Sequence, residues 1–128
     1  RTYHGCAMPL HVQKASIAAW NDENHVKENR ALYKIKFSKV CHELNSVLTV
    51  TQPSGSFYLW PKLPCSDIDF TRELYKSENV EVLPGSYLSR DVYNINPGNK
   101  RVRIALVAEV DECIEAAKRI KKFIEKKY

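Results

Sequence analysis

Arg103 is the residue whose surroundings in the sequence most clearly suggest chemistry. It stands within Val102–Val107, whose other members are all apolar. A buried cation needs a partner, because taking its charge out of water without one is costly. A guanidinium group is a planar fork of donors that matches a carboxylate, and such bonds orient a ligand. The segment therefore predicts a carboxylate-binding site or an internal salt bridge, and the local sequence leaves both open. Arg101 falls on the same strand face, since side chains alternate.

The cysteines and histidines show no spacing that favours a metal site or a nucleophile. No C-x-x-C pair is present, and the histidines are equally dispersed. Cys41 directly precedes His42, but neighbours on a helix point in different directions, so they form no dyad. We expect no metal site. The absence of a secretory signal favours reduced thiols and a cytoplasmic location. The four cysteines are Cys6, Cys41, Cys65 and Cys113.

The charge of the chain raises the question of an anionic partner. Its formal net charge is +5 and its sequence pI about 9.0, with many lysines near the C-terminal end. A solvated lysine face at the end of a helix explains this more simply than nucleic-acid binding. We therefore expect no nucleic acid among the partners, and without a long apolar run no membrane span. One function that the basic composition leaves open is that of a standalone basic αββα module that binds RNA or an acidic protein.

Two helices are expected before residue 45. The first follows Met8-Pro9, and its aliphatic residues are too many for a free surface, so we expect something outside the chain to cover it. Asn21 or Asp22 offers an N-cap for a second helix over about residues 22–44. At 1.5 Å per residue that helix would span about 35 Å, which suits a helix bridging two domains.

The remainder predicts a small sheet packed with helices. Residues 46–51 and 56–63 read as the strands of a hairpin around a turn at residues 52–55, with Phe57 and Leu59 in the core. Ser66 and Asp67 would cap a short helix over 67–77. Further strands are expected at 80–83 and 101–107, and a closing helix at 109–127. A long irregular loop over 86–100 joins the two strands, and a loop of that length in a compact domain is usually functional. The fold class is α+β, with a mainly antiparallel sheet.

Four segments, in this order and spacing, resemble the C-terminal region of class I/II aminotransferases, the fold-type-I enzymes that use pyridoxal phosphate. They are Gly55–Trp60, Val80–Tyr87, Asn96–Gly98 and Val102–Val107, and the resemblance covers nearly the whole chain. The stretch Arg1–Pro9 resembles succinyldiaminopimelate aminotransferase-like members. This resemblance implies the C-terminal small domain of that fold, preceded by a long interdomain helix.

The resemblance also assigns candidate site residues. It implies that Arg103 grips the substrate α-carboxylate. Pro84, Gly85 and Ser86 match the family's P-G-x-x-F turn on the substrate side of the active site, although Tyr87 departs from the usual pattern. Tyr3 and Gly5 fall in a region that lies at the family's dimer interface, close to the neighbouring subunit's cofactor. No catalytic residue is expected within this chain.

The family's cofactor-binding lysine motif is absent from this sequence. The resemblance implies pyridoxal 5'-phosphate in the parent enzyme, and we expect none to be bound by this chain alone. The partners it implies are a missing N-terminal large domain, a homodimer partner and a small-molecule amino-acid substrate. Residues 1–21 would be the tail of the large domain, 22–45 the interdomain helix and 46–128 the small domain. The parent would transfer amino groups between amino acids and 2-oxo acids in succinyldiaminopimelate and lysine biosynthesis, or as an aspartate or aromatic aminotransferase.

Overall fold

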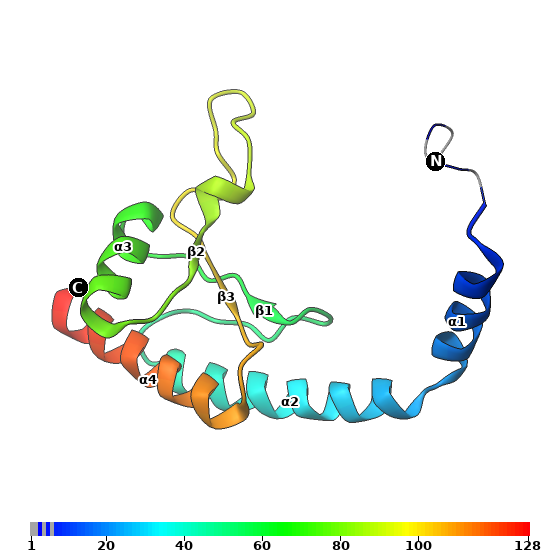
Figure 1. Ribbon diagram of the computed structural model, residues 1–128. Helices are drawn as coiled ribbons and strands as arrows, with labels where there is room; N and C mark the ends of the chain where they lie inside the picture. The colour runs from blue at the N-terminus through cyan, green and yellow to red at the C-terminus, as the bar shows by residue number, and fades with distance from the viewer. Residues whose placement is uncertain (1–2, 4, 6) are drawn as a thin grey trace. The chain divides into compact units, whose positions relative to one another are not determined.

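The computed structural model describes Tyr3, Gly5 and residues 7–128. The chain divides into two compact units at the boundary between Leu32 and Tyr33. The helices and strands run in the order shown in Figure 1. They are α1 (Leu10–Asn21), α2 (Asn24–Leu44), β1 (Tyr58–Leu59), α3 (Asp67–Glu78), β2 (Leu83–Pro84), the 3-10 helix η1 (Gly85–Leu88), β3 (Val102–Ala105) and α4 (Val110–Lys127). The expected division into 1–21, 22–45 and 46–128 stays a prediction.

The first unit contains α1 and the start of α2. None of the residues of α1 is buried, and Trp20 exposes 84% of its surface. The Asp22 carboxylate accepts a hydrogen bond from the backbone N–H of Asn24 at 3.0 Å, as expected of a residue that starts a helix. The long second helix is confirmed, with 21 residues.

The second unit is built around a three-stranded antiparallel sheet in the order β1-β3-β2. Strand β3 lies in the centre, where it pairs Ile104 with Leu59 of β1 and Arg103 with Leu83 of β2. Because both neighbours hydrogen-bond to β3, its backbone is fixed on both sides. The mainly antiparallel α+β arrangement is therefore confirmed.

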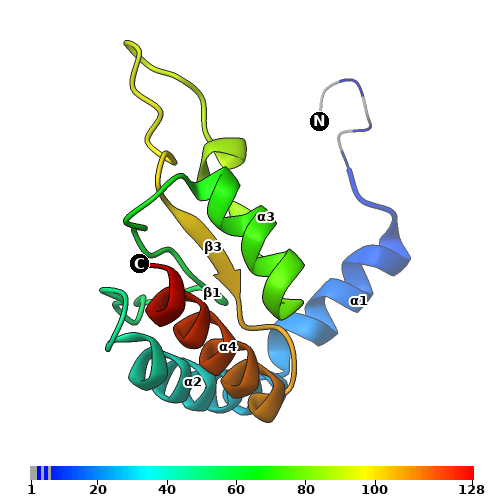
Figure 2. The same cartoon turned by 90° about the vertical axis from the view of Figure 1, so that its left-hand side faces the viewer.

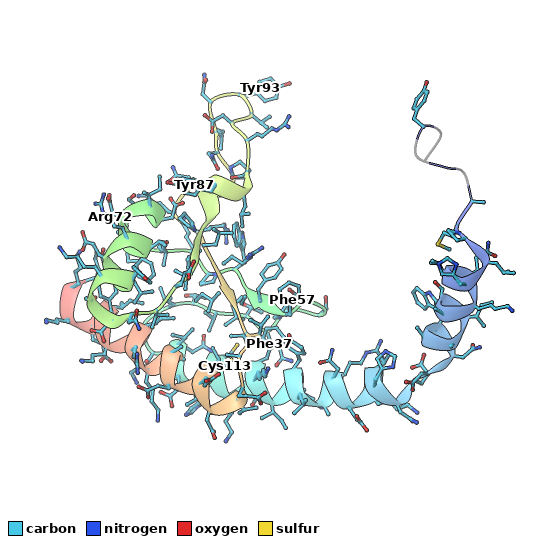
Figure 3. The ribbon with its side chains drawn as sticks, viewed as in Figure 1. Phe37, Phe57, Arg72, Tyr87, Tyr93 and Cys113 are labelled. Atoms are coloured by element: carbon cyan, nitrogen blue, oxygen red, sulfur yellow. The ribbon has the colours of Figure 1, made fainter. Side chains whose placement is uncertain are left out.

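One face of this sheet is covered by helices. Val102, Ile104 and Leu106 point into the core with at most 6% of their surface exposed. They meet buried side chains of α2, α3 and α4, which Figure 2 shows side by side next to β3. Figure 3 shows Phe37 and Cys113, both of which belong to this core. The opposite face of β3 is left for its arginines.

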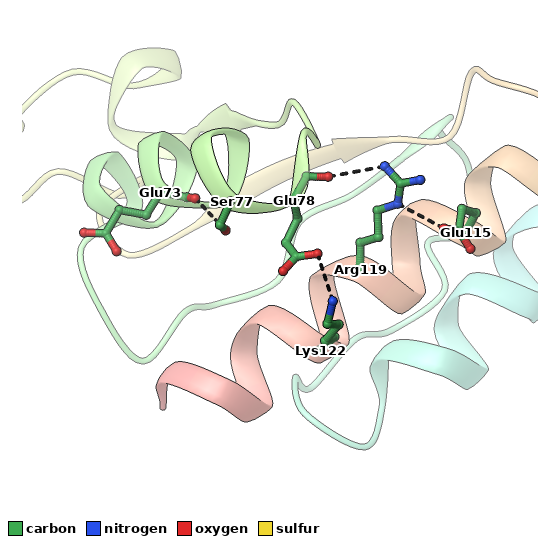
Figure 4. Close-up of polar contacts among 6 residues, drawn as sticks. All are labelled: Glu73, Ser77, Glu78, Glu115, Arg119 and Lys122. Atoms are coloured by element: carbon green, nitrogen blue, oxygen red, sulfur yellow. Dashed lines mark hydrogen bonds and ion pairs between the residues drawn. The ribbon is translucent and has the colours of Figure 1, made fainter.

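Helices α3 and α4 are capped at their starts and joined by polar contacts. Ser66 caps α3 by accepting the N–H of Asp69, and Glu109 forms a capping box at the start of α4. Arg119 of α4 donates to the backbone carbonyl of Glu78 at the end of α3, as Figure 4 shows. The two helices are thereby held together at the surface as well as through their apolar faces.

The hairpin expected over residues 46–63 is wrong in its first strand. After α2 ends, the N–H of Leu48 turns back to the carbonyl of Leu44 at 2.8 Å, and the N–H of Val50 bonds the Asn45 side chain. These donors are used locally, so residues 46–51 form no strand while Leu48 and Val50 still fill the core. Phe57 is also not a core residue, since 46% of it is exposed.

Candidate functional site

Arg103 lies at the middle of the central strand, on the face opposite the core. Its neighbours Val102 and Ile104 are 0% and 6% exposed, so alternation along β3 turns the Arg103 side chain to the other face. There it is half-buried, with Leu83 directly across on β2. A cation is thus held in a fixed place on the open face of the sheet.

The guanidinium of Arg103 has an aromatic neighbour but no anionic one. Its Cζ lies 5.9 Å from the centre of the Tyr58 ring on β1. Its Nε is buried and donates no hydrogen bond to any residue of the described part of the chain. No carboxylate of residues 7–128 lies within ion-pair distance of it. The internal salt bridge considered from the sequence is therefore not found, and a buried N–H donor without a partner is costly.

The predicted Pro84-Gly85-Ser86 turn continues directly from β2, beside the strand that carries Arg103. The N–H of Gly85 donates to the carbonyl of Arg101 at 2.8 Å, which ties the turn to β3. The chain then enters the 3-10 helix η1. The structure therefore brings Pro84, Gly85 and Ser86 to the edge of the Arg103 site, while their contact with a substrate stays a prediction.

Asp67 fixes both ends of the loop between β2 and β3. This carboxylate is 3% exposed and accepts the backbone N–H of Ser86 at 2.9 Å and that of Lys100 at 3.1 Å. Burial of Asp67 opposes its ionisation, but these hydrogen bonds outweigh it and lower the carboxyl pKa below its ordinary value. Asp67 therefore holds in place the segment that leads into Arg103.

The loop expected to be irregular has its own structure. Val92 and Ile95 exchange two backbone hydrogen bonds around Tyr93 and Asn94, whose φ angles are 50° and 64°. Positive φ at both central residues is the mark of a type I′ hairpin turn. Figure 3 shows Tyr93 at its tip, 95% exposed. The loop is thus a small projecting hairpin.

Two of the predicted residues belong to the first unit, and two residues of the second unit were not predicted. Tyr3 is 95% exposed and Gly5 has a φ of +93°; both belong to the first unit, and their expected contacts stay predictions. Tyr58 and Asp67 were not predicted as parts of the site. Asp67 follows the N-cap Ser66 in the sequence. Nothing around it indicated that its carboxylate would accept backbone N–H groups from residues 19 and 33 positions later.

The described residues do not form a site for pyridoxal phosphate. Lys36 is the one buried lysine among residues 7–128, and its Nζ points to the carbonyl of Val107 at 3.4 Å and to the Tyr33 ring at 5.0 Å. Gly85 and Gly98 pack against backbone atoms, which leaves no room for a phosphate between them. Among these residues no cluster of His, Cys, Asp or Glu suited to a metal was found.

No protein-family model matches the chain. Among solved structures, an aminotransferase from Neisseria meningitidis is 50% identical, with a TM-score of 0.90 over 97% of this chain and 32% of its own. A probable N-succinyldiaminopimelate aminotransferase from Thermus thermophilus is 30% identical, with a TM-score of 0.66 over 80% of this chain and 26% of its own. An aspartate aminotransferase from Sulfurisphaera tokodaii is 29% identical over 122 residues, covering 88% of this chain and 29% of that protein.

The high TM-score of the Neisseria meningitidis structure shows that the whole arrangement of helices and strands is shared with it. The sequence and fold are those of the C-terminal part of a fold-type-I aminotransferase, a class of pyridoxal-phosphate enzymes. The family predicted from the sequence is confirmed. The chain spans between 26% and 32% of the length of these relatives. In the described part, no helix combines the length and apolar character needed to cross a membrane.

Proposed function

We propose that this chain belongs to a pyridoxal-phosphate-dependent aminotransferase and that its Arg103 holds the α-carboxylate of the amino-acid or 2-oxo-acid substrate. The observation that carries this proposal is the buried, unpartnered Nε of Arg103 in a strand that is otherwise apolar. An incoming carboxylate supplies the missing partner and accepts two parallel N–H bonds from the guanidinium fork. When bound, the cofactor supplies the electron sink for amino-group transfer.

The surroundings of Arg103 suit a clamp that orients the substrate. β3 is paired on both sides, which limits movement of the Arg103 backbone. The guanidinium of Arg103 lies over the Tyr58 ring, and an aromatic ring attracts a cation placed over its face. A carboxylate held in one orientation fixes the direction of the bonds at the α-carbon, and such positioning lowers the barrier to reaction.

Two substrate assignments are proposed, in order of preference. N-succinyldiaminopimelate, and with it lysine biosynthesis, is supported by the similarity to the probable N-succinyldiaminopimelate aminotransferase of Thermus thermophilus and by the Arg1–Pro9 stretch. Aspartate or an aromatic amino acid is the alternative, and the similarity to the aspartate aminotransferase of Sulfurisphaera tokodaii supports aspartate. Comparing the three amino donors with the purified full-length enzyme distinguishes these assignments.

The rest of the active site is proposed to come from outside this chain. The greater length of the relatives supports a large domain that holds the cofactor. We also propose a homodimer in the cytoplasm, with Tyr3 and Gly5 near the partner subunit. Should the chain instead be a basic RNA-binding module, gel shifts would weaken steeply between low and high salt.

Steady-state kinetics of the full-length enzyme test the role of Arg103. Arg103→Ala should lower kcat/KM about 30- to 1,000-fold, equivalent to about 2–4 kcal/mol of transition-state binding. Arg103→Lys should also be impaired, because an ammonium group cannot form the fork. Arg90→Ala, at an exposed arginine, is the matched control and should have little effect. Values of kcat/KM within twofold of wild type for both Arg103 variants would refute the assignment.

A further inference from the structure

Asp67 bridges the ends of two neighbouring strands, β2 and β3. After β2 the chain passes through Gly85 to Ser86, and it approaches β3 through Lys100. One oxygen of the Asp67 carboxylate, Oδ2, accepts the N–H of Ser86 at 2.9 Å, and the other, Oδ1, accepts the N–H of Lys100 at 3.1 Å. A single buried side chain therefore closes the strand pair at the end where the loop leaves the sheet.

These bonds also tie the strand pair to helix α3. Asp67 is the first residue of α3, where the helix dipole favours a carboxylate. Phe70 and Leu74 of the same helix are fully buried in the core, so the helix itself is firmly placed. The bond from the N–H of Gly85 to the carbonyl of Arg101 joins the two strands to each other. Asp67 adds the constraint that sets their position relative to α3.

The backbone at Lys100 needs such a constraint. Its φ of 56° lies in the left-handed region, which residues other than glycine seldom adopt. Hydrogen bonds on both sides hold it there, since its N–H donates to Asp67 and its carbonyl accepts the N–H of Leu63 at 2.7 Å. Loss of the Asp67 bond would release the chain at the point where it turns into β3, three residues before Arg103.

Small movements at this point matter for the site. Strand β3 has four residues, with Arg103 second, so a change in the direction of entry is carried to the Arg103 backbone. A guanidinium fork binds a carboxylate through two parallel N–H bonds, which demand a defined orientation. A misplacement of about 1 Å can lower a rate about 100-fold. The link from Asp67 to Lys100 therefore bears on substrate binding as well as on stability.

We propose that Asp67 is a positioning residue for the reaction: by holding β2 and β3 against α3, it aims Arg103 at the substrate α-carboxylate without touching the substrate. This inference rests on the proposed function, in which Arg103 holds that carboxylate. Both oxygens of Asp67 are in use. Replacing one of them by an amide NH2 group places a donor against the N–H of Ser86 or Lys100, and that end of the strand pair is released.

The test is a double-mutant cycle in the full-length enzyme loaded with its cofactor. Asp67→Asn should lower kcat/KM for the amino donor at least about fivefold, because Arg103 is no longer correctly aimed. In the Arg103→Ala background the same change should lower kcat/KM less than about twofold, since no guanidinium remains to be aimed. Asp67→Glu, which keeps the charge but lengthens the side chain, should show the same dependence on Arg103 and is the second variant should Asp67→Asn fail to fold.

Leu44→Ala separates positioning from loss of stability. Leu44 is fully buried at the end of α2, so its truncation destabilises the fold through a cavity. At a temperature where circular dichroism shows every variant folded, Leu44→Ala should leave kcat/KM within about twofold in both backgrounds. The dissociation constant of the 2-oxo acid product, measured by calorimetric titration, should rise at least about fivefold in Asp67→Asn and stay unchanged in Leu44→Ala.

Equal losses of kcat/KM for Asp67→Asn in the two backgrounds would overturn the proposal, because Asp67 would then act independently of Arg103. An Asp67→Asn enzyme with wild-type kcat/KM and wild-type binding of the 2-oxo acid would overturn it as well. Failure of the proposed function would look different, because Arg103→Ala alone would then leave kcat/KM unchanged.

Discussion

The backbones of Gly85 and Gly98 lie directly against each other. A methyl group added at Gly85 would clash with the carbonyl of Gly98 and lie 2.7 Å from the carbonyl of Arg101. A methyl group added at Gly98 would in turn meet the Gly85 carbonyl. Two segments 13 residues apart thus close the loop that precedes Arg103, and only glycine fits at the crossing.

Gly85→Ala and Gly98→Ala should each lower the free energy of unfolding by about 2 kcal/mol or more, because backbone atoms cannot yield easily to a new side chain. Gly55→Ala is the control, since nothing lies within 4 Å of its added methyl group. Urea denaturation should show a clear loss for the first two variants and almost none for the third. Similar midpoints for all three would contradict the close packing.

Asp67→Ala should be strongly destabilising, because it leaves the N–H groups of Ser86 and Lys100 without their acceptor. The expected loss is about 2–4 kcal/mol. Asp69→Asn is the control on the same helix: that carboxylate is exposed and pairs with Arg72, so its loss should cost less than about 1 kcal/mol. Equal losses for the two variants in chemical denaturation would show that Asp67 is not the fixing point.

The contribution of Asp67 should also depend on pH. Its pKa is lower in the folded chain than in the unfolded chain, so the folded state favours the ionised form. The stabilisation is therefore fully present above the ordinary aspartate pKa and is lost as the pH falls below about 4 through the folded value. The difference in unfolding free energy between wild type and Asp67→Asn should shrink in that range. A difference that stays constant down to pH 2 would argue against an ionised Asp67.

The exposed apolar residues of α1 should make the isolated chain self-associate. Leu10, Ile17 and Trp20 expose 66%, 61% and 84% of their surfaces, and none of α1 is buried. Sedimentation should show association that weakens when Ile17 and Trp20 are both replaced by Glu. A strict monomer that also fails to bind a hydrophobic dye would contradict this expectation.

The isolated chain should retain no pyridoxal phosphate after dialysis. Its one buried lysine among the described residues, Lys36, donates to the carbonyl of Val107, and Gly85 and Gly98 pack against each other's backbone rather than around a phosphate. After pyridoxal phosphate is added and the sample is dialysed, the visible spectrum should match that of the protein before the cofactor was added. A stoichiometric absorption band that disappears in Lys36→Met would show that the chain contains a cofactor site.

Local signals in the sequence predicted local structure well. Ser66 starts α3 as expected, because a serine cap acts on N–H groups only three residues away. The apolar pattern around Arg103 likewise identified its strand. The false strand at residues 46–51 shows the limit: its β-branched residues fill the core, but Asn45 takes the N–H of Val50 that a ladder would have used.

The partners of Arg103 could not be read from the sequence, since they depend on register. Tyr58 lies on β1, 45 residues earlier, and faces Arg103 only because it pairs with Ala105. A shift of one residue would turn its ring to the core face. The role of Asp67 is equally long-range, because it requires both ends of the β2–β3 loop to meet at the start of α3.

The most direct test of the central claim is the preference of the full-length enzyme for a substrate that carries the α-carboxylate. The kcat/KM of an amino donor is compared with that of the corresponding amine, which lacks only that group, in wild type and in Arg103→Ala. Wild type should prefer the amino acid strongly, and Arg103→Ala should lower the ratio about 30-fold or more, mainly through the amino acid. A ratio unchanged by Arg103→Ala would show that Arg103 does not hold the α-carboxylate.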